Sequence, residues 1–259
     1  MTVPAGVTVH TLWSEANRRR LAVFTWLPRG ATDDPLPLVV LLHGVMDAGG
    51  HVWLQEGHAQ ETCARLVAAG ELPPFALVIA SDTGAELGTG YCDWADGTAK
   101  AETHLIGEVL PWAEATLNLD GRRHITGLSM GGYGALLTAL RHPGTFAAAS
   151  SMSGFFDPGD LFRFIPDNGR RMWADGESRA AHDVRLLLAD PSRRRNLRIG
   201  FDCGRDDVLI EANRRMHQQL LGDDVPHAYA EVGGGHEWPV WRTRLAVHLR
   251  FLLGRQAAL

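Results

Sequence analysis

One serine stands in a pattern that could make it a nucleophile. Ser129 lies in Gly127-Leu-Ser-Met-Gly131, between a short strand-like run over 123–126 and a helical pattern that begins at Tyr133. A Gly-x-Ser-x-Gly at a strand-to-helix junction forms a sharp turn that presents the serine hydroxyl at the end of the strand. The helix N-terminus that follows offers unpaired N–H groups and a partial positive charge. The same residues also suit a glycine-rich turn whose serine only caps a helix. A histidine and an acid elsewhere in the chain are needed to distinguish the two interpretations.

A serine hydroxyl needs a histidine to take its proton and a carboxylate to orient that histidine. His236 follows three glycines after the strand expected to end at Val232, which places it in a loop at a strand end. Two aspartates compete for the acid, because Asp206 and Asp207 are adjacent and cannot point the same way. Asp207 comes last before the helix expected from Val208, and we favour it for that reason. Serine, acid and histidine thus follow in the order that this fold type requires.

The negative charge that forms on the substrate during attack needs two backbone N–H groups. Met130 follows the serine directly and should supply one of them. The loop after the apolar run that ends at Leu42 should supply the other from Val45, with Gly44 allowing close approach. His43 in this loop is expected to be a buried residue that bonds the backbone.

Strand and helix patterns alternate along the chain. Runs 7–12 and 21–26 predict a hairpin, and the remaining strands are expected at 38–42, 75–80, 146–152, 197–202 and 227–232. Helices are expected over 55–69, 102–117, 133–140, 208–221 and 239–253, and Pro111 should kink or split the second. This alternation predicts one domain over residues 1–259 with an α/β-hydrolase fold, in which a mostly parallel central sheet carries helices on both faces.

Two long segments between these elements are the places where a substrate pocket could form. Residues 81–98 form a polar loop, and residues 154–183 form an irregular segment that should be a small cap. The second segment is rich in large apolar side chains: Phe155, Phe156, Phe162, Phe164, Ile165 and Trp173. They either pack as a satellite of the core or, with Phe155 and Phe156 first, form an acyl wall of the substrate pocket together with Trp173.

Composition limits the classes of partner. The chain has 259 residues, a net charge of −5 and a pI of about 6.2, which argues against nucleic acid. Cys63, Cys92 and Cys203 lack metal or redox spacing, so we expect no metal and no cofactor. Their small number, with no apolar stretch of signal or membrane length, predicts a cytoplasmic protein that does not bind membranes. The oligomeric state is left open.

Four pieces of sequence together resemble a known esterase family. They are Leu41 to Gly44, Gly127 to Ala135, Cys203 to Leu209, and Gly235 to Trp238 with Trp241 after it. The chain is similar to the α/β-hydrolase esterases that include esterase D, the tributyrin esterases and the antigen 85 mycolyltransferases. The resemblance implies a catalytic triad of Ser129, Asp207 and His236, and an oxyanion hole of the Val45 and Met130 N–H groups. The run after the serine differs from that of the mycolyltransferases, which argues against long-chain acyl transfer.

These observations lead to one functional hypothesis and two alternatives. The first is a serine carboxylesterase that hydrolyses small or short-acyl esters through an acyl-enzyme intermediate. An acyltransferase would use the same triad with an alcohol in place of water. A non-enzymatic binding protein on a hydrolase fold would be expected to have lost a triad member, and this sequence has all three. The natural substrate is not indicated by the sequence.

Overall fold

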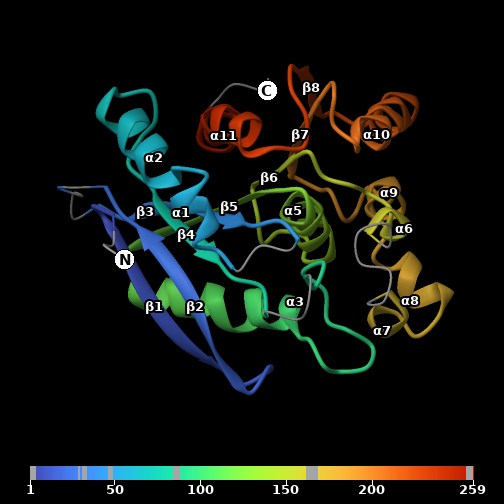
Figure 1. Ribbon diagram of the computed structural model, residues 1–259, viewed down its shortest axis with the longest axis horizontal. Coiled ribbons are helices and arrows are strands. Elements are labelled where there is room, and N and C mark those ends of the chain that lie inside the picture. Colours follow the sequence, from blue (N-terminus) through green and yellow to red (C-terminus); the bar gives the residue numbers. More distant parts are fainter. Residues whose placement is uncertain are drawn as a thin grey trace.

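The computed structural model describes residues 4–28, 30, 34–45, 49–83, 88–161, 169–254 and 259. Its strands form one sheet of eight in the order β1-β2-β4-β3-β5-β6-β7-β8 (Figure 1). The strands are β1 Val7–Ser14, β2 Arg19–Trp26, β3 Leu36–Leu42, β4 Ala76–Ala80, β5 Leu119–Leu128, β6 Ala148–Met152, β7 Arg198–Gly204 and β8 Ala228–Val232. The helices are α1 Val52–Gln55, α2 Ala59–Ala68, α3 Ala101–His104, η1 Leu105–Val109, α4 Leu110–Thr116, α5 Met130–Arg141, α6 Pro158–Leu161, α7 Gly169–Met172, α8 Gly176–Ala180, α9 Val184–Ala189, α10 Ile210–Gly222 and α11 Trp238–Leu253.

The sheet is mostly parallel, as the sequence predicts. The hairpin of β1 and β2 is antiparallel, and β2 also runs antiparallel to β4. From β4 through β3, β5, β6 and β7 to β8 every neighbouring pair is parallel. The loops that follow the parallel strands therefore emerge at one edge of the sheet, which is where such folds bind ligands.

Apolar side chains cover both faces of the sheet. All seven residues of β3 and all five of β4 are buried, as expected for strands enclosed by helices on two sides. One core layer joins the sheet to α5, α9 and α10, and the other joins it to α1, α2 and α11. In Figure 1, α11 and α2 lie on one side of the strands while α3 and its continuation lie on the other.

The irregularity expected at Pro111 takes the form of a π-helical turn. The segment η1 (Leu105–Val109) separates α3 from α4, and the N–H of Leu110 donates to the carbonyl of Leu105. Pro111 then falls in the first turn of α4, where its missing N–H leaves no broken bond. The wider turn lets the helical path continue through a residue that would otherwise interrupt it.

Other boundaries differ from the sequence prediction. The helix expected over 55–69 begins later, as α2, because His58 before it adopts a left-handed conformation with φ of 48°, and the residues up to Gln55 form the separate short helix α1. Strand β5 starts earlier than expected and extends over ten residues. The segment 154–183 contains α6, α7 and α8, which lie beside α9 in Figure 1. Residues 162–168, and with them Phe162, Phe164 and Ile165, lie outside the described residues.

Candidate active site

Ser129 occupies a strained turn between β5 and α5. Its backbone has φ of 51° and ψ of −117°, a conformation that costs a non-glycine residue about 1–3 kcal/mol. Its N–H donates to the carbonyl of Met152 at 2.8 Å, and its carbonyl accepts from the N–H of Tyr133 at 3.0 Å. The turn is therefore held from the neighbouring strand β6 and from the first turn of α5. This is the tight strand-to-helix turn that the glycine pattern predicts.

The glycines beside the serine are needed because backbones approach closely. A Cβ atom on Gly127 would lie 2.5 Å from the carbonyl oxygen of Gly131 and 2.7 Å from that of Leu42. A Cβ atom on Gly131 would collide with the same Leu42 oxygen and with the His43 oxygen. Only glycine at both positions lets α5 start so close to the end of β3, which brings the loop after β3 beside the serine.

His236 joins the serine to an aspartate. Its Nε2 lies 2.9 Å from the Oγ of Ser129, and its Nδ1 lies 3.0 and 2.9 Å from Oδ1 and Oδ2 of Asp207. The three residues, called the candidate triad below, come from the loops after β5, β7 and β8. The neighbouring Asp206 is exposed. The structure thus brings together the three residues that the sequence singled out, and it places Asp207 on the histidine.

The carboxylate of Asp207 is held by more than the histidine. Its side chain is fully buried, and Oδ1 also accepts the N–H of Leu209 at 2.8 Å. Burial acts to raise the pKa of Asp207, but the hydrogen bond and charge of His236 outweigh it, and the pKa lies below its ordinary value. The acid is therefore an anion near neutral pH, suited to orient the imidazole and to stabilise its protonated form.

An aromatic cluster supports the imidazole of His236 from the side. Trp241 meets the ring edge-to-face with the ring centres 4.8 Å apart, and Trp238 meets Trp241 in the same manner at 5.4 Å. Trp53 packs on Trp238 at 5.3 Å and donates its indole N–H to the carbonyl of Leu42 at 2.9 Å. The role of Trp53 was not foreseen, because it belongs to a short helix far away in sequence.

The two residues expected to supply the oxyanion donors both lie beside Gly88. A Cβ atom on Gly88 would lie 2.6 Å from Sδ of Met130 and 3.6 Å from Cα of Val45, so both residues flank Gly88. His43 is 1% exposed, and its Nε2 accepts the N–H of Asp82 at 3.0 Å. Its Nδ1 must then carry the proton, which it donates to the carbonyl of Gly44 at 2.9 Å. The oxyanion role of the two N–H groups stays a prediction.

The aromatic residues expected at the pocket are buried. Phe155 and Phe156 are each 1% exposed; the first stacks on Tyr133 at 4.5 Å and the second meets Phe201 at 5.2 Å. Trp173 is 6% exposed and lies 6.0 Å from His182 between ring centres. All three belong to the core layer around α5. Their packing favours the core interpretation, and their role as an acyl wall stays a prediction.

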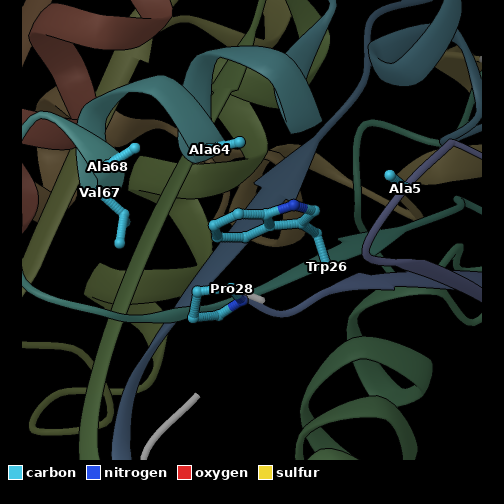
Figure 2. A pocket seen from close by; sticks show the side chains of 6 residues that line it. All are labelled: Ala5, Trp26, Pro28, Ala64, Val67 and Ala68. Carbon is cyan, nitrogen blue, oxygen red and sulfur yellow. The ribbon is translucent and has the colours of Figure 1, made fainter. Parts of the chain in front are cut away.

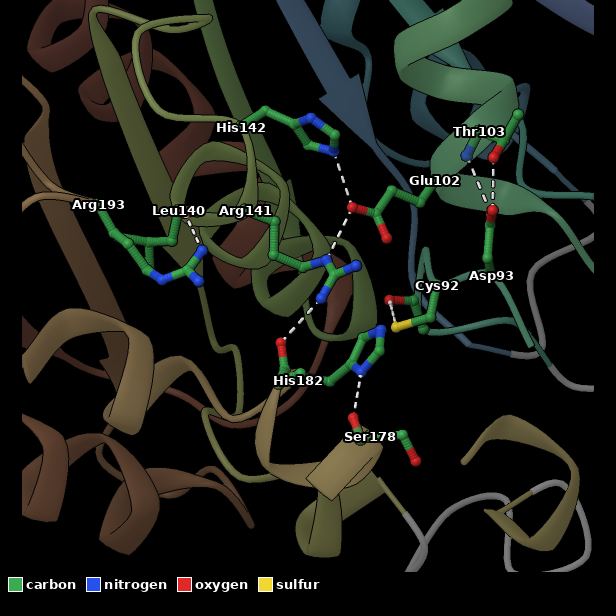
Figure 3. A network of polar contacts seen from close by, with 12 residues as sticks. Cys92, Asp93, Glu102, Thr103, Leu140, Arg141, His142, Ser178, His182 and Arg193 are labelled. Carbon is green, nitrogen blue, oxygen red and sulfur yellow. Dashed lines mark hydrogen bonds and ion pairs between the residues drawn. The ribbon is translucent and has the colours of Figure 1, made fainter. Parts of the chain in front are cut away.

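A polar network anchors the far end of α5. Glu102 accepts hydrogen bonds from Nε of Arg141 and Nε2 of His142, each at 2.7 Å (Figure 3). Arg141 also donates to the carbonyl of Ala181 at 3.0 Å. Burial acts to raise the pKa of Glu102, but the bonds from His142 and Arg141 lower it below its ordinary value. The network ties the helix that begins at the serine to α3 and to the segment after α8.

One hollow lies elsewhere on the molecule. A cavity of about 390 Å³ is lined by Ala5, Trp26, Pro28, Ala64, Val67 and Ala68, between β2 and α2 (Figure 2). No member of the candidate triad lines it. Among the described residues, no three His, Cys, Asp or Glu side chains are placed to hold a metal ion. In the same part of the chain, no helix is long and apolar enough to cross a membrane.

Comparison with known proteins gives related esterases. The chain is 27% identical to an acetyl esterase of Caldicellulosiruptor saccharolyticus over 54% of its own length and 58% of that protein. It is 30% identical to esterase MT1326 of Mycobacterium tuberculosis, over 54% of its own length and 37% of that protein. It therefore spans less than two thirds of these relatives. A solved ferulic acid esterase superposes with a TM-score of 0.83 at 28% identity, covering 95% of this chain and 97% of the other.

The family itself is established by a match along most of the chain. A family model described as putative esterase matches residues 14–252, a range that runs from the last residue of β1 to the last turn of α11. The superposition on the ferulic acid esterase confirms the predicted α/β-hydrolase fold. The resemblance inferred from the motifs is likewise confirmed by this match. The chain belongs to the putative esterase family.

Proposed function

We propose that this chain is a serine carboxylesterase that hydrolyses small or short-acyl esters through an acyl-enzyme intermediate. The observation that carries the proposal is the position of His236, whose two ring nitrogens lie within 3.0 Å of the Ser129 hydroxyl and the Asp207 carboxylate. Membership of the putative esterase family supports it. These residues supply the chemistry without a metal or cofactor. The cytoplasmic location inferred from the few cysteines is part of the same proposal.

Acylation begins at the serine. Oγ of Ser129 attacks the ester carbonyl carbon while Nε2 of His236 takes the hydroxyl proton. Asp207 holds the Nδ1–H of the ring and stabilises the imidazolium that forms. The carbonyl oxygen becomes an oxyanion, which accepts hydrogen bonds from the N–H groups of Val45 and Met130. Collapse of this intermediate breaks the ester bond, and the imidazolium gives its proton to the departing alcohol.

Deacylation repeats the sequence with water. The alcohol leaves the site, and a water molecule takes its place beside His236, which removes a proton from it. The resulting hydroxide attacks the acyl carbon, the oxyanion forms again at the same two N–H groups, and the serine leaves with the proton from the imidazolium. An acyltransferase would differ only in this half-reaction, where an alcohol would replace water.

The short acyl preference rests on the segment after β6. The chain turns at Ser153 and Gly154, after the strand that pairs with β5, whose end leads into Ser129, and Phe155 and Phe156 follow directly. Bulky rings there would limit the length of the acyl group, since each methylene gains about 0.8 kcal/mol only where it is buried. One relative bears the name acetyl esterase. We therefore propose acetyl to butyryl esters as the best substrates, with a steep fall by octanoyl.

A graded series of p-nitrophenyl esters tests this function. Wild-type protein should hydrolyse the acetyl to butyryl esters, and Ser129→Ala should reduce turnover by about 10⁴-fold or more. Hydrolysis by the alanine variant at the wild-type rate would refute the mechanism, and a preference for decanoyl or longer would refute the substrate class. Product analysis with a competing alcohol separates hydrolysis from transfer, because a transferase would form mainly the new ester.

A further inference from the structure

The short loop Gly88–Tyr91 contacts both residues that are proposed to hold the oxyanion. Gly88 fits between the side chain of Met130 and the backbone of Val45, where a Cβ atom would lie 2.6 and 3.6 Å from them. The N–H of Gly90 donates to Sδ of Met130 at 3.3 Å. Gly88 and Gly90 have φ of 115° and 66°, values that favour glycine, so the loop can follow this path. The loop is therefore built around the two donors.

Tyr91 ties this loop to the strand end that leads to Val45. Its hydroxyl accepts the N–H of His43 at 2.9 Å and donates to the carbonyl of the same residue at 3.3 Å. These two groups belong to the peptides on either side of His43. One hydroxyl thus fixes two successive peptide planes, and the peptide that follows them directly carries the N–H of Val45.

The ring of Tyr91 is itself held against α5. A Cβ atom on Gly134 would lie 2.5 Å from Cδ2 of Tyr91, so the helix needs glycine there to admit the ring. Tyr91 also has φ of 54°, a strained value for a side chain of this size. Strain of this kind persists where the surroundings impose it, and it gathers at functional sites. The helix that supports the ring begins at Met130, so both donors share one support.

Hydrogen bonds close this arrangement into a ring of buried residues. Thr89 accepts the N–H of Tyr91 on its hydroxyl at 3.1 Å and donates its own N–H to Oδ2 of Asp82 at 3.1 Å. Asp82 donates its N–H to Nε2 of His43 at 3.0 Å, and His43 returns to Tyr91. These four residues are at most 6% exposed. Because every link is buried, loss of one link should shift the loop rather than admit water in its place.

We propose that Tyr91 is a positioning residue for the oxyanion hole. Its hydroxyl holds the His43–Val45 backbone so that the N–H groups of Val45 and Met130 converge on one oxygen. The inference rests on the proposed function, since it assigns a purpose to the two donors of that mechanism. Donors of this kind act because they are oriented before the charge develops, and a small displacement removes much of their effect.

The test compares two buried tyrosines that each lose a hydroxyl. Tyr91→Phe removes the bonds to His43, whereas Tyr133→Phe removes an equally buried bond to the carbonyl of His182 at 2.8 Å. With p-nitrophenyl butyrate, Tyr91→Phe should lower kcat by about 10- to 100-fold while KM stays within about threefold. Affinity for an aryl trifluoromethyl ketone, whose adduct with the serine carries an oxyanion, should fall by the same factor.

The control separates positioning from mere stability. Tyr133→Phe should keep kcat and ketone affinity within about threefold of wild type, although it also loses stability. If Tyr91→Phe keeps both quantities, or Tyr133→Phe loses them equally, the positioning role is refuted. If Tyr91→Phe does not fold, Thr89→Val replaces it, because this variant removes the hydroxyl that accepts the Tyr91 N–H. It should lower kcat and ketone affinity, and unchanged values would refute the positioning role. Absence of ester hydrolysis by the wild type, or its survival in Ser129→Ala, would instead refute the proposed function.

Discussion

The sheet of this protein carries two serine–histidine–aspartate groups whose atoms lie at nearly the same distances. Besides the candidate triad there is a buried trio, formed by Ser150 on β6, Asp202 on β7 and His248 on α11. Nδ1 of His248 lies 2.9 Å from Oγ of Ser150, and its Nε2 lies 3.0 Å from Oδ2 of Asp202. In the candidate triad the two ring nitrogens exchange roles: Nε2 lies 2.9 Å from the serine, and Nδ1 lies 2.9 and 3.0 Å from the aspartate oxygens. Residue types and distances therefore do not separate a reactive group from a structural one.

Access and backbone position separate them. Ser150 and His248 are fully buried within the core, and Ser150 donates its hydroxyl proton to Oγ1 of Thr126 at 2.9 Å. Ser129 lies in a strained turn at the end of its strand, and the side chain of His236 is 23% exposed. Ser129 is 4% exposed and Ser150 is fully buried, and of the two only Ser129 lies at a helix N-terminus.

Charge also differs between the two groups. Asp202 pairs with Arg244 as well as facing His248, whereas Asp207 has no arginine within ion-pair distance among the described residues. Burial acts to raise the pKa of Asp202, but the charges of His248 and Arg244 outweigh it and leave it below its ordinary value. Since its partners already satisfy the acid, the buried trio fastens α11 to the sheet. Fastening α11 in turn fixes the start of that helix, two residues after His236.

Removing each serine should produce the largest contrast. Ser129→Ala should lower kcat by about 10⁴-fold or more and abolish labelling by a fluorophosphonate, because the nucleophile is gone. Ser150→Ala should keep kcat/KM near the wild-type value and lower the free energy of unfolding by about 1–3 kcal/mol. Kinetics and denaturant unfolding measure both effects. Loss of activity in a folded Ser150→Ala protein would contradict a purely structural role for Ser150.

Removing each acid should give the next largest effect. Asp207→Asn should lower kcat by about 10³- to 10⁴-fold, since the imidazole would adopt the wrong tautomer, while the exposed Asp206→Asn should change it little. Asp202→Asn should instead lower the free energy of unfolding by about 3–5 kcal/mol, because it breaks a buried ion pair. A reversed order of Asp206 and Asp207 in the kinetics would move the triad acid to Asp206.

Truncating Phe155 and Phe156 tests whether these residues only pack in the core or also form the acyl wall. If they belong to the core, Phe155→Ala and Phe156→Ala should each lower the free energy of unfolding by about 3–5 kcal/mol, as for other buried rings. If they also form the acyl wall, the variants should hydrolyse hexanoyl and octanoyl esters better, relative to acetyl, than the wild type does. Rates across the ester series measure this ratio at a temperature where the variants are folded. An unchanged ratio in both variants rules out the acyl wall.

The buried side chain of His124 on β5 should make the free energy of unfolding depend on pH. Burial, aided by Arg198 and Arg122, lowers the pKa of His124 to about 4 from its ordinary value of 6.5. The unfolded chain then binds the extra proton between these values, so stability is full above about pH 6.5 and is lost as the pH falls towards 4. The loss amounts to about 3 kcal/mol. It should largely disappear in His124→Gln, while the control His58→Gln, at a half-buried histidine, keeps it. An equal slope in both variants would contradict this assignment.

Local sequence was sufficient to predict the turn at Ser129 and the buried parallel strands. The turn at Ser129 was predictable because glycine is the residue that fits where Gly127 and Gly131 meet the neighbouring carbonyls. The strands were predictable because a parallel sheet covered on both faces requires continuous apolar runs, such as β3 and β4. Order along the chain then supplied the histidine and narrowed the acid to two adjacent aspartates.

Tertiary structure decided what depends on contacts between distant segments. Asp206 and Asp207 are alike in sequence, and only the path of the loop after β7 turns Asp207 to His236. Tyr91 gave no local sign of its bond to the backbone of His43, which lies 48 residues earlier in the chain. The buried trio and the candidate triad contain the same three residue types. What differs is solvent access and backbone strain, and both follow from packing around a residue rather than from its neighbours in sequence.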